Sequence, residues 1–355
     1  MKLLVTGATG FLGRHVVVEA LRRGHHVRAM VRPDTSEDAL PWRPTAGLTF
    51  VRADLRSPRG LREAVRGVDA VLHLAAAKTG DFYTQFRGTV NATENLLNAM
   101  ADESIRRLVQ VSSFSVYDYE KLRCGSTLTE DSQLIDIYAD RDAYAITKLL
   151  QEQLAREFAE EHGGLVTILR PGVIYGRGNS WTARLGVQWG HRWIRIGANA
   201  PLPLIYVEHC AEAVVLAAEK PASIGQTINL VDDDQPTQRR YMRALAAHAP
   251  ERPTIIPINW SCMRLLARLA ILTNNLLFGG RARLPGILIP ARLHARCKPL
   301  RYDNQRMKSL LAIQPRYDLQ TALARCFTTP ESVVTPLADG HTVDKEVQDA
   351  CASPI

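Results

Sequence analysis

The sequence lacks the cysteine spacing on which small secreted domains and zinc proteins depend. Its six cysteines are scattered without a C-x-x-C pair, so neither a disulfide framework nor a metal site is predicted. No apolar run reaches the roughly 18 residues that a membrane-spanning helix needs. No apolar signal region precedes the first strand-like run, Lys2–Val5. We therefore expect a cytoplasmic protein with reduced thiols.

Acidic residues are absent between Thr254 and Tyr302, where the chain has seven arginines and one lysine. This segment alone accounts for the net charge of +8 of the whole 355-residue chain. A nucleic-acid-binding protein would usually spread its basic residues over a binding face. Here they stand among leucines and isoleucines, so no nucleic-acid partner is predicted. The composition, with 46% hydrophobic and 23% charged residues, is that of an ordinary globular protein with a large core.

Short apolar runs alternate with helical stretches through the first 170 residues. The predicted strands are Leu3–Val5, Val27–Val31, Leu48–Val51, Ala70–Leu74, Leu108–Val111 and Val166–Leu169. The predicted helices are Phe11–Arg23, Arg59–Val65, Thr89–Met100 and Tyr144–Glu161. This alternation predicts an α/β fold of the Rossmann type, a doubly wound parallel sheet with helices on both faces.

The regular alternation ends at Pro171. We predict a dinucleotide-binding core over residues 1–171 and a smaller C-terminal, mainly substrate-binding region over 172–327, part of which returns to the sheet edge. In that region we expect a helix over Ala211–Glu219, a strand over Thr227–Val231 and a helix near Gln238–Ala247. Residues 328–355, rich in Pro, Thr, Ser and acids, are expected to form a disordered tail.

A glycine-rich turn follows the first strand and begins the first helix. Gly7 allows a sharp turn, Gly10 allows the backbone to approach a pyrophosphate, and Gly13 allows the helix to pack on the sheet. The helix N-terminus then presents free N–H groups to the anion. Thr9, Phe11 and Leu12 stand between and beside these glycines and are expected to contact the cofactor with them. A tight turn without a ligand is the alternative.

The G-x-x-G-x-x-G spacing resembles that of the extended short-chain dehydrogenase/reductase superfamily, the NAD-dependent epimerase/dehydratase family. The similarity covers roughly residues 1–325 and includes His73–Ala76, Asn95–Leu97 and Arg170–Gly176. Within this family, the motifs resemble most those of members such as 3-beta-hydroxysteroid dehydrogenase and dihydroflavonol reductase. The resemblance implies that Ala75, Pro171 and Val173 line the cofactor and that Asp54 and Leu55 contact its adenine. It also implies a homodimer through the fourth and fifth helices of the family's fold, which here correspond to the predicted helices Thr89–Met100 and Tyr144–Glu161.

The end of the second predicted strand indicates which nicotinamide cofactor is used. An NAD-preferring site usually has an acid there, which holds the ribose 2′-OH. This chain has Val31 and Arg32 at that place. An arginine would pair with a 2′-phosphate through charge-assisted hydrogen bonds. We therefore favour NADP over NAD, with Arg32 as the phosphate contact and Arg28 as a weaker candidate; a solvated surface arginine is the alternative.

Tyr144 and Lys148 lie four residues apart in a helical stretch, which places both side chains on one face. A nearby ammonium favours the phenolate and lowers the tyrosine pKa. Lys148 can also hold the nicotinamide ribose. Matching Val116-Tyr117 to the usual ending of the family's serine motif places the catalytic serine at Ser113, with Ser112 and Ser115 as alternatives. Its hydroxyl would polarise the reacting carbonyl, while Tyr144 exchanges the proton.

Departures from the family's motifs narrow the substrate. Phe114-Ser115 stand where 4,6-dehydratases have an Asp-Glu pair, which disfavours dehydration. Uncharged Pro201–Pro203 stand where nucleotide-sugar epimerases commonly have an arginine for the diphosphate, although Arg184, Arg192 or Arg195 could substitute. We therefore expect an NAD(P)-dependent oxidoreductase for an apolar, sterol-like secondary alcohol or ketone. The alternatives are a nucleotide-sugar epimerase that holds NAD tightly and a non-catalytic dinucleotide-binding scaffold subunit.

Residues 260–278 predict a helix with one narrow polar stripe, formed by Ser261, Arg264, Arg268 and Asn275. One interpretation is a helix of the substrate lid that packs on the body. The other is a hydrophobic substrate funnel or a helix at an anionic membrane surface. In the last case, residues 260–301 would make a peripheral membrane contact, and the protein would be membrane-associated.

Overall fold

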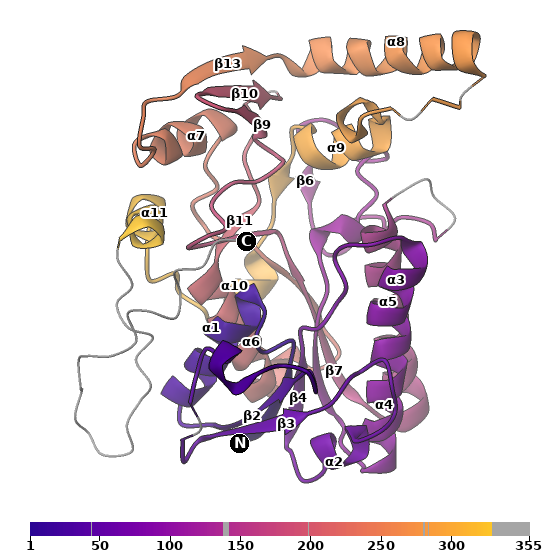
Figure 1. Ribbon diagram of the computed structural model, residues 1–355, viewed down its shortest axis with the longest axis vertical. Coiled ribbons are helices and arrows are strands. Elements are labelled where there is room, and N and C mark those ends of the chain that lie inside the picture. Colours follow the sequence, from indigo (N-terminus) through magenta and orange to yellow (C-terminus); the bar gives the residue numbers. More distant parts are fainter. Residues whose placement is uncertain (44, 138–141, 198, 280, 283, 329–355) are drawn as a thin grey trace.

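A seven-stranded sheet forms the centre of the molecule, in the order β12-β7-β5-β4-β1-β2-β3 (Figure 1). The computed structural model describes residues 1–43, 45–137, 142–197, 199–279, 281–282 and 284–328. All neighbouring strands of this sheet are parallel. The strands are β1 (Lys2–Thr6), β2 (His26–Val31), β3 (Leu48–Arg52), β4 (Ala70–His73), β5 (Arg107–Val111), β7 (Leu165–Pro171) and β12 (Thr227–Leu230). The strand order reverses beside β1, which confirms the predicted Rossmann-type doubly wound sheet.

Helices cover both faces of the sheet because successive strand side chains point to opposite sides. On β1, Leu3 and Val5 belong to the core cluster that also contains residues of α1, α6 and α10. Leu4 belongs to the other cluster, with residues of α2, α4 and α5. The bounds of these helices are α1 (Phe11–Arg22), α2 (Leu61–Val65), α4 (Ala92–Asp102), α5 (Ala143–His162), α6 (Val207–Glu219) and α10 (Gln305–Leu311). The helix predicted from Thr89 differs at its start, since a π-helical turn over Arg87–Asn91 precedes α4.

Most of the remaining elements form a second, smaller part of the molecule, whereas α3 (Phe82–Phe86) packs beside α5 (Figure 1). A three-stranded sheet has the order β13-β10-β9. Its strands are β9 (Gly186–Trp189), β10 (Arg192–Ile196) and β13 (Thr254–Ile258). Two short parallel pairs are β8 (Val173–Tyr175) with β11 (Leu204–Tyr206) and β6 (Thr127–Leu128) with β14 (Arg301–Tyr302). The remaining helices are α7 (Gln238–Ala246), α8 (Trp260–Phe278), α9 (Pro290–Cys297) and α11 (Leu319–Phe327). Short 3-10 turns lie at Glu37–Ala39, Phe114–Val116, Pro221–Ser223 and Gly286–Leu288. The expected tail lies outside the described residues, apart from Thr328.

Segments from the second half of the chain complete the core of the first half. Strand β12 pairs with β7 at the sheet edge, and α6 packs against α1. The buried guanidinium of Arg107, at the start of β5, helps to hold these segments. It donates hydrogen bonds to the Leu165 carbonyl at 2.6 Å, to the Ser223 hydroxyl at 3.0 Å, and to carbonyls in the last turn of α6. A cation at a helix C-terminus is electrostatically favourable.

Replacement of Arg107 by methionine should therefore destabilise the fold. Several buried acceptors would lose their donor, so the free energy of unfolding should fall by roughly 2–4 kcal/mol. Urea denaturation followed by circular dichroism measures the change. The neighbouring Arg106 is exposed and donates to the Gly163 carbonyl, so Arg106→Met should cost less than about 1 kcal/mol. Equal losses in the two variants would contradict this role of Arg107.

Candidate functional site

The glycine turn joins β1 to α1 at the carboxyl edge of the sheet. Gly7 has a φ of +67°, in the left-handed region that favours glycine. A Cβ on Gly13 would lie 2.1 Å from the Gly7 carbonyl oxygen, so no side chain fits there. Gly10 is exposed and precedes α1, whose N-terminus has no side-chain cap. The turn therefore leaves room, backbone and helix dipole for a pyrophosphate group.

The segment after β4 lies directly against this turn. A Cβ on Gly7 would approach the Ala75 nitrogen to 2.9 Å, and the Ala75 N–H donates to the Thr6 hydroxyl at 3.3 Å. The same hydroxyl lies 2.7 Å from Nδ1 of His73. Burial and the charge of Lys148 lower the pKa of His73 to about 3. His73 is therefore neutral, and its ring links β4 to β1 through Thr6.

The predicted catalytic serine and tyrosine are brought together. Ser113 follows β5, and its side chain lies close enough to Tyr144, in the first turn of α5, to act on the pKa of that phenol. The Ser115 N–H donates to the Ser113 hydroxyl oxygen at 3.1 Å. Of the two alternatives, Ser112 is buried beside Glu152, and Ser115 supplies that backbone contact. The geometry favours Ser113 among the three serines.

Lys148 lies one turn after Tyr144 and points into the protein. Its ammonium donates to the Val111 carbonyl at 2.7 Å and to Oε1 of Gln151 at 2.8 Å. The amide nitrogen of Gln151 lies 2.8 Å from the Thr93 hydroxyl on α4 and 3.2 Å from Nε2 of His73. A continuous buried hydrogen-bond network therefore joins Lys148 to the glycine turn.

Burial changes the acidity of both helix residues. Burial raises the pKa of Tyr144, while the side chain of Ser113 acts in the opposite direction. This differs from the expected lowering, because the cost of desolvating the phenolate dominates. Burial, followed by the charge of Lys78, lowers the pKa of Lys148 to about 7. Lys78 lies in the exposed segment after β4 and was not expected at the site.

The residues expected near the adenosine end stand at the ends of β2 and β3. Asp54 forms a two-pronged ion pair with Arg56, with Nη2 at 2.7 Å from Oδ2. That hydrogen bond, and more weakly the charge of Arg32, lower the pKa of Asp54. The Leu55 carbonyl accepts a hydrogen bond from Asn95 at 2.9 Å. Arg32 is exposed and acts on Asp54 only through its charge, whereas Arg56 is bonded to this carboxylate.

Arg28 does not belong to this group. Its guanidinium donates to the carbonyls of Glu63, Ala64 and Arg66, at 3.3, 2.7 and 3.0 Å. These carbonyls lie at the C-terminal end of α2. The suggestion that Arg28 assists in phosphate binding is therefore wrong, because its side chain caps a helix instead.

The segment after β7 meets the uncharged stretch before β11. Pro171 ends β7 and is buried, and the Val173 N–H donates to the Pro203 carbonyl at 2.6 Å. A Cβ on Gly172 would lie 2.2 Å from the same carbonyl oxygen. Pro171 and Val173, expected at the nicotinamide end, therefore adjoin the segment expected on the substrate side.

A buried ion pair supports α5 behind the site. Arg170 on β7 donates to both carboxylate oxygens of Glu152, at 2.9 and 2.7 Å. The guanidinium also donates to the Tyr117 hydroxyl at 3.1 Å and lies 4.9 Å from the centre of that ring. Glu152 and Gln151 were not predicted, although Gln151 follows Lys148 by three residues and Tyr144 by seven. That helical spacing is the signal that could have identified Gln151.

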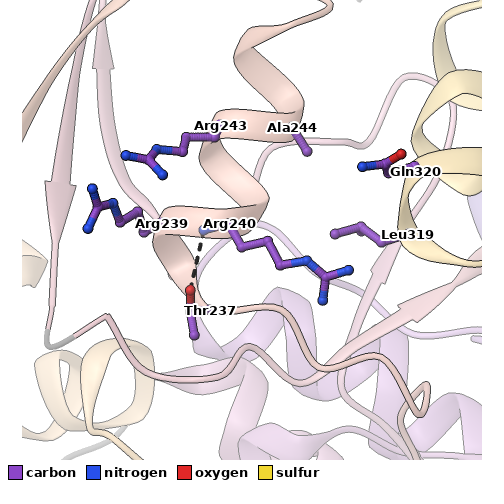
Figure 2. A pocket seen from close by; sticks show the side chains of 7 residues that line it. All are labelled: Thr237, Arg239, Arg240, Arg243, Ala244, Leu319 and Gln320. Carbon is purple, nitrogen blue, oxygen red and sulfur yellow. Dashed lines mark hydrogen bonds between the residues drawn. The ribbon is translucent and has the colours of Figure 1, made fainter.

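A surface cavity of about 530 Å³ lies elsewhere, between α7 and α11 (Figure 2). It is lined by Thr237, Arg239, Arg240, Arg243, Ala244, Leu319 and Gln320. No predicted catalytic or cofactor residue is among them. The group of Ser113, Tyr144 and Lys148 is the better candidate site, because Lys148 is joined to the glycine turn by a buried hydrogen-bond network.

Comparison with protein families and curated proteins agrees with this arrangement. A family model described as "NAD dependent epimerase/dehydratase family" matches residues 3–230, from β1 to the end of β12. The chain is 31% identical to a 3-beta-hydroxysteroid dehydrogenase of Mycolicibacterium neoaurum, over 61% of this chain and 61% of that protein. It is 30% identical to cinnamoyl-CoA reductase 1 of Petunia hybrida, over 62% and 70%. The match thus spans less than two thirds of the dehydrogenase.

Solved structures share the fold. The UDP-glucuronic acid 4-epimerase from Bacillus cereus in complex with NAD has a TM-score of 0.68 and 20% sequence identity, over 92% of this chain and 97% of that chain. MoeE5 in complex with UDP-glucose and NAD has a TM-score of 0.65 and 22% identity, over 92% and 97%. At these identities the likeness shows the fold alone.

The low pKa of Lys148 predicts a pH-dependent activity. kcat/KM should fall as the pH rises through about 7, where the ammonium of Lys148 loses its proton. Lys78→Gln removes a like charge, which favours the ammonium and should move this alkaline limb to higher pH. Rate profiles of the two proteins measure the shift. Lys121→Gln, at a side chain 60% exposed beside Asp118, should leave the profile in place; an unmoved limb in Lys78→Gln would contradict the electrostatic coupling.

Proposed function

Because the chain belongs to the NAD dependent epimerase/dehydratase family, we propose that it transfers hydride between a nicotinamide cofactor and a secondary alcohol or ketone. The family is the one predicted from the motifs, and that prediction is confirmed. One observation carries the proposed activity. The hydroxyl of Ser113 lies beside the phenol of Tyr144 and acts on its pKa, and Lys148 lies on the next helical turn.

The residues at the site can divide the work of such a reaction. The nicotinamide, when bound, supplies or accepts the hydride. Ser113 donates a hydrogen bond to the reacting oxygen and polarises it. Tyr144 gives or takes the hydroxyl proton. Lys148 can hold the nicotinamide ribose with its ammonium.

The glycine cradle fits a dinucleotide, and the charges near Asp54 favour NADP. Gly7, Gly10 and Gly13 leave no side chain over the first turn of α1. Arg32 follows β2, where a carboxylate would repel a 2′-phosphate, and Arg56 adds a second guanidinium beside Asp54. We propose that Arg32 pairs with the 2′-phosphate and that Asp54 and Leu55 face the adenine.

An apolar substrate is favoured by the residues beside the nicotinamide end. Pro203, in an uncharged stretch, packs against Gly172 and Val173. The guanidinium of Arg184, which could have replaced the epimerase arginine, donates instead to the hydroxyls of Tyr302 and Tyr119, at 3.3 and 3.0 Å. A sterol-like alcohol or ketone fits this environment, and the likeness to the named dehydrogenase and reductase supports it.

A nucleotide-sugar epimerase is the second candidate. Arg192 and Arg195 lie on β10. Burial lowers the pKa of Arg195, and the nearby charges of Arg239 and Arg243 lower it further. Guanidinium groups gathered in this way could hold a diphosphate. An epimerase would retain NAD through purification, whereas the oxidoreductase would need added NADPH or NADH.

The role of Tyr144 is tested by Tyr144→Phe. Loss of the proton donor should lower kcat by roughly 10²–10⁴-fold, with NADPH binding unchanged. NADPH oxidation against sterol, flavonoid and UDP-sugar carbonyls identifies the substrate and measures the loss. Tyr83, whose side chain is largely exposed, provides the control Tyr83→Phe, which should keep full turnover. Undiminished turnover in Tyr144→Phe would exclude the proposed mechanism.

Cofactor preference is tested by Arg32→Gln. Loss of a charge-assisted hydrogen bond should lower kcat/KM for NADPH by about tenfold to a hundredfold, with NADH changed by less than about twofold. Arg28→Gln serves as the matched control, since its helix-capping role affects stability but not the NADPH/NADH ratio. Equal kcat/KM for the two cofactors in the unaltered protein would contradict the preference for NADP.

A further inference from the structure

Helix α8 buries one narrow side and exposes a leucine-rich face. Its buried residues are Trp260, Met263, Ala267 and Asn274. The first three pack with α9 and the turn before it, and Asn274 exchanges hydrogen bonds with the backbone of Ala282. The opposite side carries large apolar side chains that are 49–74% exposed: Leu265, Leu266, Leu269, Leu272, Leu276 and Leu277. A contiguous apolar face of this kind is rare on a soluble monomer and marks an interaction surface.

The helix lies at the periphery of the molecule. In Figure 1, α8 runs along the end opposite to α2 and extends past the elements below it. Among the described residues, its main packing partners are α9 and the Gly286–Leu288 turn. The homodimer that the family resemblance implies would use α4 and α5, which are not among these partners. The leucine-rich face would therefore remain uncovered in such a dimer.

Basic side chains border this face. A helical period of 100° per residue places Arg264 and Arg268 together along one flank of the leucines. Arg264 lies over the ring of Trp260, 6.0 Å from its centre. Burial lowers the pKa of His294, on the neighbouring helix α9, to about 4, and the charges of Lys298, Arg264 and Arg268 contribute to this lowering. Positive charge is thus concentrated where α8 meets the body.

The charge of the wider segment decides between two kinds of partner. From Pro236 to Tyr302 the sequence has eleven arginines and one lysine against one acid, Glu251. Two copies that met through this face would bring two such segments together, and their like charges would repel. An anionic lipid surface satisfies both features, since acyl chains accept the leucines and headgroups accept the arginines.

We propose that α8 docks the protein on anionic membranes, lying in the plane of the interface with its leucine-rich face toward the acyl chains. None of the described helices is long and apolar enough to cross a membrane. Contact is therefore peripheral, and its strength depends on both apolar burial and charge. The proposal concerns a surface away from Ser113 and Tyr144, so it does not depend on the reaction that they perform.

Vesicle co-sedimentation of the full-length protein tests this docking. Vesicles of phosphatidylcholine and phosphatidylglycerol in equal amounts should pellet the protein at low salt. Vesicles of phosphatidylcholine alone, or high salt, should weaken binding by roughly tenfold or more. Equal recovery in the supernatant under all of these conditions would overturn the proposal.

Paired variants separate the two contributions. Leu269→Glu with Leu276→Glu should abolish binding, whereas Leu165→Glu, at an apolar residue 37% exposed at the start of β7, should not. Arg264→Gln with Arg268→Gln should weaken binding several-fold, and Arg43→Gln with Arg59→Gln, two exposed arginines outside the segment, should retain it. Circular dichroism verifies the fold of each variant. Pelleting of the Leu269→Glu, Leu276→Glu protein like the unaltered protein would exclude α8 as the docking element.

Self-association through α8 is the competing outcome. Light scattering coupled to gel filtration, without lipid, measures the oligomeric state of the same proteins. A dimer that Leu269→Glu with Leu276→Glu converts to monomers, in a protein that vesicles fail to pellet, would assign the face to a second copy and overturn the membrane proposal.

Discussion

The hydrogen bond from the buried ammonium of Lys148 to Gln151 connects the candidate site to the rest of the fold. Because Gln151 uses its oxygen for Lys148, its amide nitrogen faces Thr93 and His73. Nε2 of His73 also lies 2.9 Å from the Thr93 hydroxyl, and Nδ1 lies 2.7 Å from the Thr6 hydroxyl beside the glycine turn. Every group in this network is buried, so the loss of one member would leave its neighbours unsatisfied. The network thus ties α5, α4, β4 and β1 together around the place where a nicotinamide cofactor would lie.

Two buried arginines extend this connection, and one of them reaches the second half of the chain. Arg107 joins β5 to the end of α6, and Arg170 joins β7 to Glu152 on α5. Buried charges are costly unless they are paired and hydrogen-bonded, so each arginine orders the segments that supply its acceptors. The dinucleotide-binding part and the later segments consequently share one core, since β12 is an edge strand of the sheet that begins at Lys2 and α6 packs on one face of that sheet.

The two ends of the molecule differ in chemistry. The carboxyl edge of the sheet combines a positive helix end, Arg32 and the ion pair of Asp54 with Arg56, which suits a phosphorylated dinucleotide. The part formed by β13, α8 and α9 combines exposed leucines with arginines and almost no acid. The apolar-substrate proposal follows from the uncharged stretch that ends at Pro203, and the membrane proposal follows from exposed leucines in a segment, Pro236 to Tyr302, with a single acid.

Local pattern determined much of this protein. Strand and helix periods, the spacing of Gly7, Gly10 and Gly13, and the four-residue separation of Tyr144 and Lys148 are properties of neighbouring residues, so the sheet, its helices and the grouping of the site were predictable from sequence. Only the tertiary structure decided the partners of buried polar groups. It assigned Arg28 to the end of α2, placed Lys78 near Lys148, raised rather than lowered the pKa of Tyr144, and left the leucines of α8 exposed. Each of these depends on burial and on contacts between residues distant in the chain, which periodicity does not encode.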